Sequence, residues 1–371
     1  MRPTFAKINR SNLKFNFLNI KKKVKNAKIM AVVKADAYGH GMTECVKTLL
    51  SLENKKPDYF AVALFEEALE FRKAGFKEPV LVFAPPLLSE APDFLKYNVL
   101  PTVFTEEHLN FFRSLNKNRK IRVHIKIDTG MGRLGVKYTD AVDFIRKVSQ
   151  DKRFVIDGIY THFATSDERD KTFADLQLKR FKSIIDQLKS EGINYGLTHA
   201  ANSGAILDMP EAYFDMIRPG ISLYGYYPSD ETSESIKLKP VMSLVTSITN
   251  IKEITKGESV SYGRKFIAKE KTRIATASVG YADGYVRGLS NKAEVIIKGK
   301  KYPQIGQVCM DRIMFNLGTN GSVKENDEVI LLGKEKGAEF TAADWARILN
   351  TIPYEITCNI SKRVPRVYTE K

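Results

Sequence analysis

Eight short apolar segments alternate with stretches of helical spacing in the first part of the chain, and this alternation limits the possible folds more than any other feature. The segments are Ile29–Val33, Tyr59–Ala63, Val80–Phe83, Val99–Val103, Ile121–Ile127, Phe154–Thr161, Tyr195–His199 and Phe214–Ile217. Eight strands separated by helices predict an α/β fold, the (β/α)8 or TIM barrel. The alternative is an open doubly wound sheet, but no Gly-x-Gly-x-x-Gly motif follows the first segment.

Helical patterns lie between these segments and before them. Phe65–Ala74 has apolar residues at helical spacing and ends at Gly75, a typical C-terminal signal. Before the first segment, Thr4–Ile8 predicts a short strand, and a helix follows it. In a later helix we expect one apolar face made of Phe173, Leu176, Phe181, Ile184, Ile185 and Leu188.

The pattern changes after the polar, proline-containing segment Tyr227–Ser235, which we interpret as a linker. The strand-like segments beyond it are Val241–Ile254, Arg273–Val279, Glu294–Lys298, Gln307–Asn316 and Glu328–Leu332, with a short helix near Ala342–Ile348. Frequent glycines separate them, which is typical of a β domain. We therefore predict a barrel over residues 1–235 and a mainly β domain over residues 236–371. Residues 1–9 could pair with the second domain.

Charge and cysteine content argue against several classes of protein. The 59 Lys and Arg residues exceed the 43 Asp and Glu residues, giving a net charge of +16. The basic residues are scattered, which favours a solvated surface over nucleic-acid binding. Cys45, Cys309 and Cys358 are far apart and match no metal-ligand spacing. No signal peptide or membrane-spanning run is evident, so we expect a cytoplasmic enzyme without a metal.

Barrel enzymes carry their functional groups at the carboxyl ends of the strands. Lys34 follows the first segment, where its amine either extends into solvent or is paired or chemically used. After the last two segments, Asn202–Gly204 and Gly220 offer the parts of a phosphate site. A lysine facing a phosphate site matches the needs of pyridoxal phosphate, and Arg218 is a candidate partner for its ring nitrogen.

Each of these residues also has a structural interpretation. His162 and His199 could be core histidines bonded to the backbone. Ser203 could cap a helix, Arg133 could be a surface arginine beside a glycine-rich turn, and Arg218 could pair with a structural carboxylate. Their shared position at strand ends favours a functional site.

Longer motifs in both halves of the chain resemble alanine racemase. They are Ala31–Gly41, Lys126–Gly135 (KIDTGMGRLG), Thr161–Asp167 (THFATSD), His199–Gly204 (HAANSG), Arg218–Gly225 (RPGISLYG), Ser261–Gly263 (SYG), Gly280–Gly284 (GYADG), Val308–Asp311 (VCMD) and Arg363–Arg366 (RVPR). The matches follow the family's order almost from end to end. The resemblance implies a dimeric enzyme that racemises alanine, supplies D-alanine for peptidoglycan and binds pyridoxal phosphate.

The resemblance also implies a role for individual residues. Lys34 would hold the cofactor and act as one of two catalytic bases, and Tyr262 of the opposite subunit would be the other. Two bases on opposite faces are what racemisation needs, because one removes the Cα proton and the other returns it from the far side. Arg218 would bind the pyridine nitrogen and limit the ring's capacity to withdraw electrons.

Further positions match the cofactor and substrate sites of the family. The cofactor set comprises Lys34, Tyr38, His162, Asn202, Ser203, Arg218, Gly220 and Ile221. Arg133 and Met310 would bind the substrate carboxylate. Lys126, a candidate for carbamylation, would position Arg133, and His199 would orient Arg218. The remaining supporting positions are Tyr281, Asp167, Arg287 and Asp311, of which the first three match the substrate entrance.

Two positions depart from the pattern. Lys362 stands before Arg363–Arg366 where many relatives carry a tyrosine, and Gln307 stands where some carry an arginine. A wider entrance would admit larger amino acids, so a racemase that also accepts serine is an alternative. A decarboxylase with the same two domains and a non-catalytic cofactor carrier are further alternatives. The Tyr262 and Met310 motifs favour the racemase.

Overall fold

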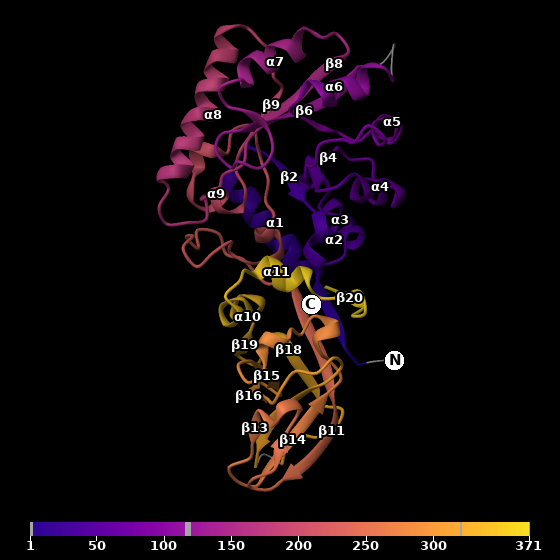
Figure 1. Ribbon diagram of the computed structural model, residues 1–371, viewed down its shortest axis with the longest axis vertical. Helices are drawn as coiled ribbons and strands as arrows, with labels where there is room; N and C mark the ends of the chain where they lie inside the picture. The colour runs from indigo at the N-terminus through magenta and orange to yellow at the C-terminus, as the bar shows by residue number, and fades with distance from the viewer. Residues whose placement is uncertain (1–2, 116–119, 320, 371) are drawn as a thin grey trace.

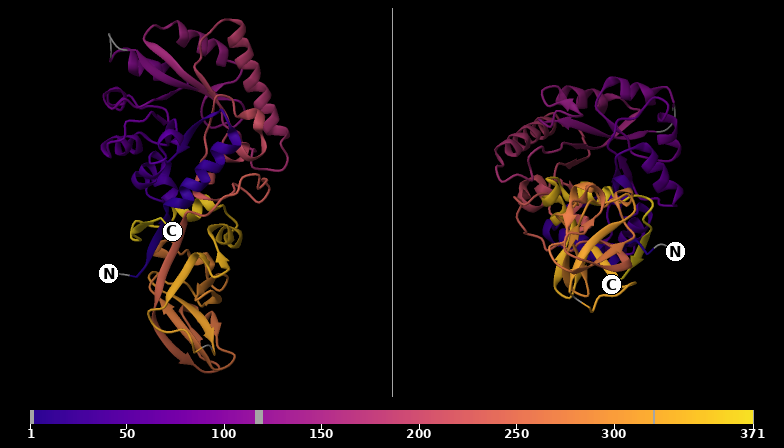
Figure 2. Two further views of the ribbon diagram at one scale, coloured as in Figure 1. Left: turned by 180° about the vertical axis from the view of Figure 1, so that it is seen from behind. Right: turned by 60° about the horizontal axis from the view of Figure 1, so that its bottom comes forward.

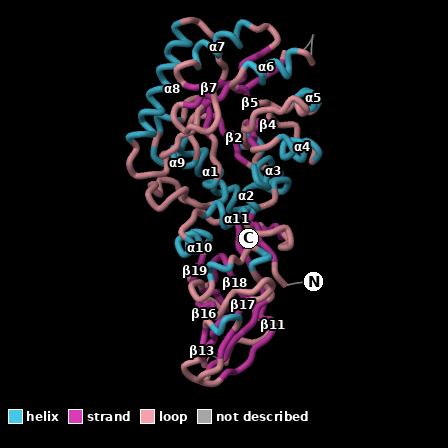
Figure 3. Tube along the Cα trace, viewed as in Figure 1, coloured by secondary structure: helices cyan, strands magenta, loops and turns pink. Residues whose placement is uncertain are grey.

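Two domains lie end to end along the long axis of the molecule (Figure 1). The computed structural model describes residues 3–115, 120–319 and 321–370. Residues 1, 2 and 371, which are the outer limits of the two predicted domains, lie outside the described residues. Helices surround strands in the N-terminal domain, whereas strands dominate the C-terminal domain (Figure 3).

Eight parallel strands form the centre of the N-terminal domain. They are β2 (Lys28–Val32), β3 (Tyr59–Val62), β4 (Val80–Val82), β5 (Thr102–Val103), β6 (Ile121–Asp128), β8 (Phe154–Tyr160), β9 (Leu197–His199) and β10 (Met216–Ile217). Pairing links β10-β2-β3-β4 and β5-β6-β8-β9, and a bridge between Leu81 and Leu100 joins the two sheets. The N–H of Arg218 donates to the carbonyl of Ala201 (2.8 Å) between the ends of β9 and β10. The strands thus follow chain order and the last pairs with the first.

All eight predicted strand segments are confirmed, and helices follow most of the strands. The helices are α1 (Arg10–Val24), α2 (Lys34–Gly39), α3 (Met42–Leu50), α4 (Phe65–Lys73), α5 (Ala91–Lys96), α6 (Glu106–Arg113), α7 (Ala141–Gln150), α8 (Thr172–Ser190) and α9 (Ser203–Asp208). Helix α1 precedes the first of the eight strands, lies across the back of the domain (Figure 2) and packs against α3 and the η3 turn (Ile221–Tyr224). No helix in the described part of the chain is long and apolar enough to cross a membrane.

The apolar face of α8 was predicted incorrectly at two positions. Phe173 and Leu176 are 38% and 41% exposed, whereas Ala174, Gln177 and Leu178 are buried. The helix presents the face defined by residues 174, 178, 181, 185 and 188 to the core, and the two large side chains lie outside this face. The prediction assigned the large apolar side chains to the buried face, but a small alanine and a glutamine occupy part of that face.

The C-terminal domain is built on a sheet of nine strands. They are β1 (Phe5–Asn9), β11 (Met242–Ile254), β14 (Thr272–Ala277), β15 (Glu294–Ile297), β16 (Lys300–Ile305), β17 (Ile313–Gly318), β18 (Glu328–Glu335), β19 (Ala338–Phe340) and β20 (Arg366–Thr369). The first strand of the chain, β1, pairs with β11 and with β20 and so belongs to this sheet. The short pair β12 (Ser259–Val260) and β13 (Phe266–Ile267), with α10 (Ala342–Leu349) and α11 (Pro353–Cys358), completes the domain.

One predicted strand of this domain is wrong in part. Gln307–Asn316 was expected as a single strand, but β17 begins only at Ile313. The preceding residues form a turn in which the N–H of Cys309 donates to the carbonyl of Arg312 (3.0 Å). Strand β16 was not predicted, because Gly299 directly before it and Pro303 within it are residues that usually interrupt strands.

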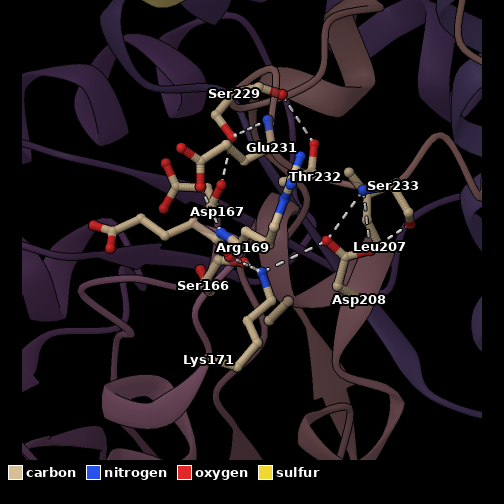
Figure 4. A network of polar contacts seen from close by, with 12 residues as sticks. Ser166, Asp167, Arg169, Lys171, Leu207, Asp208, Ser229, Glu231, Thr232 and Ser233 are labelled. Carbon is tan, nitrogen blue, oxygen red and sulfur yellow. Dashed lines mark hydrogen bonds and ion pairs between the residues drawn. The ribbon is translucent and has the colours of Figure 1, made fainter.

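The predicted linker is bound to the N-terminal domain (Figure 4). The hydroxyl of Ser229 donates to the carbonyl of Asp167, and the carboxylate of Glu231 accepts from the N–H of Arg169 (2.6 Å). The N–H of Ser233 donates to the carboxylate of Asp208 (3.2 Å). The polar residues that suggested a linker therefore tie this segment to the loop between β8 and α8 and to the end of α9.

Candidate functional site

A cavity of about 350 Å³ lies at the carboxyl ends of the eight parallel strands. Its walls include ten of the residues proposed from the sequence: Lys34, Tyr38, Lys126, Arg133, His162, Asn202, Ser203, Arg218, Gly220 and Ile221. These residues come from the ends of five different strands, β2, β6, β8, β9 and β10. The ring of strands therefore brings together groups that are far apart in the sequence.

Lys34 begins a left-handed turn at the end of β2. The four residues after it, from Ala35 to Tyr38, have φ angles of 51° to 54°, a conformation that costs about 1–2 kcal/mol for each L-residue. The carboxylate of Glu67 accepts hydrogen bonds from the N–H groups of Ala35 (2.5 Å) and Ala63 (2.7 Å). Glu67, on α4, thus ties the strained turn to the neighbouring strand end. Burial and then the charge of Arg133 lower the pKa of Lys34.

Arg218 lies on the floor of the cavity and is only 4% exposed. Its Nη2 donates to the carbonyls of Thr161 (2.7 Å) and Ala200 (3.0 Å), and its Nη1 lies 2.9 Å from His199 Nδ1. Tyr160 packs beneath the guanidinium, with 5.3 Å between Arg218 Cζ and the ring centre. Burial lowers the pKa of Arg218 to about 10, so the guanidinium remains charged at neutral pH.

Ser203 and Gly220 form a concave polar surface on one side of the cavity. Asn202 caps α9 by accepting from the N–H of Ala205 (3.1 Å), so Ser203 is free of the capping role considered for it. Ser203 Oγ instead accepts from the N–H of Gly220 (3.0 Å). A Cβ added at Gly220 would lie 2.5 Å from the hydroxyl of Tyr38, so only glycine leaves this surface open.

Lys126 faces the same cavity from β6 and is 5% exposed. Burial, together with the positive charges of Arg133 and Arg218, lowers its pKa to about 8. His162 faces Arg218, with 3.4 Å between Arg218 Nη2 and His162 Nδ1. Burial and the charge of Arg218 hold the pKa of His162 well below its usual value, so this imidazole is neutral at pH 7.

The residues proposed from the C-terminal domain do not line this cavity. Tyr262 (71% exposed) and Met310 (52% exposed) lie on the surface of their own domain. Ser261 donates to the carbonyl of Gln307 (2.6 Å), and the N–H of Tyr281 donates to the carbonyl of Cys309 (3.0 Å). These bonds join the segments that carry Tyr262, Met310 and Tyr281. Arg287 and Asp311 belong to the same domain, and Arg363 donates to Asp311 (2.7 Å).

Tyr354 was missed by the sequence argument. It lines the cavity beside Tyr38, with 5.9 Å between the ring centres, and it comes from α11 of the C-terminal domain. Lys362, which stands where many relatives carry a tyrosine, is exposed and does not line the cavity of its own chain. The sequence signal that could have drawn attention to Tyr354 was its position directly after Pro353, which predicts the start of a helix.

We expect the Lys126→Met variant to be more stable than the parent protein, by about 3 kcal/mol at pH 7. The folded pKa of Lys126 (about 8) is below the unfolded value of 10.5, so the destabilising charge is fully present below pH 8. It disappears as the pH rises to the unfolded pKa, and the gain should shrink between pH 8 and pH 10.5. Chemical denaturation in buffer free of carbon dioxide measures this, with Lys22→Met, at an exposed position, as the control. A gain independent of pH would contradict the prediction.

Both halves of the chain match known protein families. Family models for the N-terminal domain and the C-terminal domain of alanine racemase match residues 8–228 and 241–368. Alanine racemase 2 of Caldanaerobacter subterraneus subsp. tengcongensis is 44% identical, over 99% of this chain and 95% of that protein. The alanine racemase of Halothermothrix orenii is also 44% identical, over 100% and 98%.

Solved structures agree with these matches. The alanine racemase of Clostridium difficile 630 superimposes with a TM-score of 0.91 at 39% identity, covering 100% of this chain and 96% of that chain. The alanine racemase of Bacillus anthracis with bound L-Ala-P gives a TM-score of 0.91 at 33% identity, with coverage of 100% and 96%. The two family models together span almost the whole sequence, in the order of the two domains. The chain belongs to the alanine racemase family.

Proposed function

We propose that this chain interconverts L-alanine and D-alanine with pyridoxal phosphate as its cofactor. The observation that carries the proposal is a single cavity that combines Lys34, Arg218 and the concave surface of Ser203 and Gly220. The family of the chain supports the same activity. We further propose that the eight parallel strands form a (β/α)8 barrel, which is supported by the pairing of β10 with β2. The division at residue 235 belongs to the same proposal.

The residues of the cavity fit pyridoxal phosphate. A phosphate needs hydrogen-bond donors, which Tyr38, Ser203 and the backbone around Gly220 and Ile221 supply in a hollow that a side chain would fill. A cationic donor for the ring nitrogen is present in Arg218, and Lys34 offers an amine for covalent attachment. Tyr354 adds a hydroxyl beside Tyr38. His162 and Asn202 line the cavity and complete the set.

Two bases of this chain would move the proton of the substrate. When bound, pyridoxal phosphate withdraws electrons from the substrate Cα and makes its proton acidic. Lys34, whose pKa burial lowers, would take or return that proton at Nζ on one face. The hydroxyl of the partner subunit's Tyr262 would act on the opposite face. Arg218 would keep its own protons, so the ring nitrogen would stay an acceptor, and the ring would stabilise the negative charge that develops at Cα less strongly.

The substrate carboxylate would lie near Arg133. Arg133 lines the cavity and is exposed, and the buried Lys126 lines the same cavity. Carbamylation would turn Lys126 into an anion able to hold the guanidinium, and the low pKa of its amine favours that reaction. Met310 of the partner subunit would contact the same carboxylate. Asp167, Tyr281 and Arg287 would form the entrance, with Asp311 in support.

A homodimer would complete this site. In one chain the η4 turn (Tyr262–Arg264) lies next to β13, at the far end of the molecule from α2 (Figure 1). Exposed Tyr262, Tyr281 and Met310 are therefore available to a second copy and not to the cavity of their own chain. A closed two-fold dimer would form two equivalent sites.

The proposed activity is tested by chiral analysis of the products from a panel of L-amino acids. We expect D-alanine from L-alanine, dependent on added pyridoxal phosphate. The same panel tests the alternative of broader specificity, because a wider entrance would give D-serine from L-serine at a comparable rate. Release of carbon dioxide without D-alanine would instead indicate a decarboxylase and would contradict the proposal.

We expect Tyr262→Phe to slow removal of the Cα proton from one enantiomer of alanine far more than from the other. The two enantiomers have equal free energies, so kcat/KM stays equal in both directions, and exchange of the Cα proton is the informative quantity. In D2O the variant should exchange the Cα proton of the enantiomer served by Lys34 without inverting it. The other enantiomer should exchange about 100-fold more slowly. NMR of each alanine enantiomer measures this, and equal, mild losses for both would contradict the two-base assignment.

Mixed dimers test whether the site is shared. Lys34→Ala and Tyr262→Phe should each inactivate a homodimer. In a hybrid dimer one of the two sites contains both native residues, so a mixture re-associated at random should recover about one quarter of the parent activity. Activity after denaturing and refolding the two variants together is the measurement. If Lys34 and Tyr262 acted within one chain, the mixture would recover nothing.

A further inference from the structure

Three hydrogen bonds run through the interior of the N-terminal domain from Arg218 to Asp157. Arg218 Nη1 lies 2.9 Å from His199 Nδ1, and His199 Nε2 lies 3.0 Å from His124 Nδ1. His124 Nε2 lies 3.1 Å from Asp157 Oδ2. Both imidazoles are completely buried. We call these four residues the interior chain.

The chemistry of the two ends determines the direction of every bond between them. A guanidinium can only donate, so His199 Nδ1 must accept and the proton of this imidazole must lie on Nε2. That proton is donated to His124 Nδ1, so the proton of His124 also lies on Nε2. It is donated to Asp157, whose ionised carboxylate can only accept. Both histidines are therefore neutral and have the same tautomer.

Burial and the surrounding charges agree with these protonation states. Burial lowers the pKa of His124 and, with the charge of Arg218, holds that of His199 well below its usual value. Burial opposes ionisation of Asp157, but hydrogen bonds from His124 and Arg122 lower its pKa to about 2.

A β-bulge places Asp157 at the end of the interior chain. The pairing of β6 with β8 joins Val123 to Ile156 and then His124 to Gly158, so Asp157 is the extra residue. A bulge of this kind turns a side chain out of its regular alternation. Gly158 gives the imidazole its space, because a Cβ there would lie 2.9 Å from His124 Nδ1.

The other oxygen of Asp157 is occupied by a second guanidinium. Arg122 donates to Oδ1 from Nε (2.9 Å) and Nη2 (2.6 Å), and the hydroxyl of Tyr59 lies 3.3 Å from Oδ2. Oδ2 is thus shared by His124 and Tyr59. At the other end of the interior chain, Tyr160 stacks on His199 with 4.7 Å between ring centres and 7° between planes.

No carboxylate of the described residues forms a hydrogen bond or ion pair with Arg218. Among the described residues its hydrogen-bond partners are two carbonyls and two imidazoles. The orientation of this guanidinium therefore depends on His199 being an acceptor at Nδ1. The negative charge that enforces this state lies two imidazoles away.

We propose that Asp157, acting through His124, is a positioning residue that sets the tautomer of His199 and thereby the orientation of Arg218 in the cavity. The kinetic consequence rests on the proposed function, because it requires Arg218 to bind the cofactor. The tautomers can be measured without turnover, so this proposal and the proposed function can fail separately.

Asp157→Asn tests the proposal. Arg122 requires an oxygen, so the amide nitrogen of the new side chain must face His124. His124 Nε2 then becomes an acceptor, its proton moves to Nδ1, and His199 in turn carries its proton on Nδ1, against Arg218. With 15N-labelled histidine, NMR of the holoenzyme should show Nε2–H for both residues in the parent protein and Nδ1–H in the variant. The chain has 5 histidines, so the spectrum can be assigned by substitution.

Asp151→Asn is the matched control. Asp151 is, like Asp157, a half-buried carboxylate. It accepts hydrogen bonds from two arginines, Arg113 (3.0 Å) and Arg153 (2.8 Å), and it has no hydrogen bond to the interior chain. We expect it to leave the tautomers and kcat unchanged. We expect Asp157→Asn to lower kcat for alanine by about ten- to a hundredfold, with KM changed much less. Unchanged tautomers in Asp157→Asn, or the same change in Asp151→Asn, would overturn the proposal.

A second pair of variants, at His124, tests the proposal if Asp157→Asn does not fold. His124→Gln keeps an amide that can accept from His199 and donate to Asp157, whereas His124→Leu keeps neither function. The glutamine variant should retain a hydrogen-bonded Nε2–H on His199 and most of the activity. In the leucine variant the Nε2 proton of His199 has no acceptor, so its NMR resonance should shift and kcat should fall. A leucine variant with an unchanged His199 Nε2–H resonance and full kcat would overturn the proposal.

Discussion

The guanidinium of Arg218 is a charge buried at the centre of the N-terminal domain, and much of the surrounding structure supplies its acceptors. Strand ends provide the carbonyls of Thr161 and Ala200, and the domain interior provides His199. Burying such a charge without full pairing is costly. The same arrangement leaves one face of the guanidinium toward the cavity, where a ligand can use it.

The general plan of the N-terminal domain could be predicted because each part of it is local in the sequence. Eight apolar runs marked the strands, and residues after those runs, such as Lys34 and Arg218, had to meet at one end of a closed ring. The interior of the site could not be predicted in this way. Asp157 reaches His124 only because of a β-bulge, and the alternation of side chains along β8 gives no indication of it.

The other failures have related physical causes. Tyr354 enters the cavity from the second domain, so its role depends on the docking of α11, which no local pattern encodes. Glu67 looks like an ordinary residue of a helix start, yet it supports the strained turn after Lys34. The polar segment near Ser229 resembled a free linker, but its side chains bond to the loop that carries Asp167.

The pairing of β1 with β20 has a consequence for how the molecule is made. Ala6, near the start of the chain, lies beside Arg366, near its end. During synthesis the first strand must remain unpaired on its β20 side until β20 has left the ribosome. A long loop then closes in one late step, which is the kind of contact that slows folding. The C-terminal sheet is therefore the part of the fold that is finished last, although its first strand is made first.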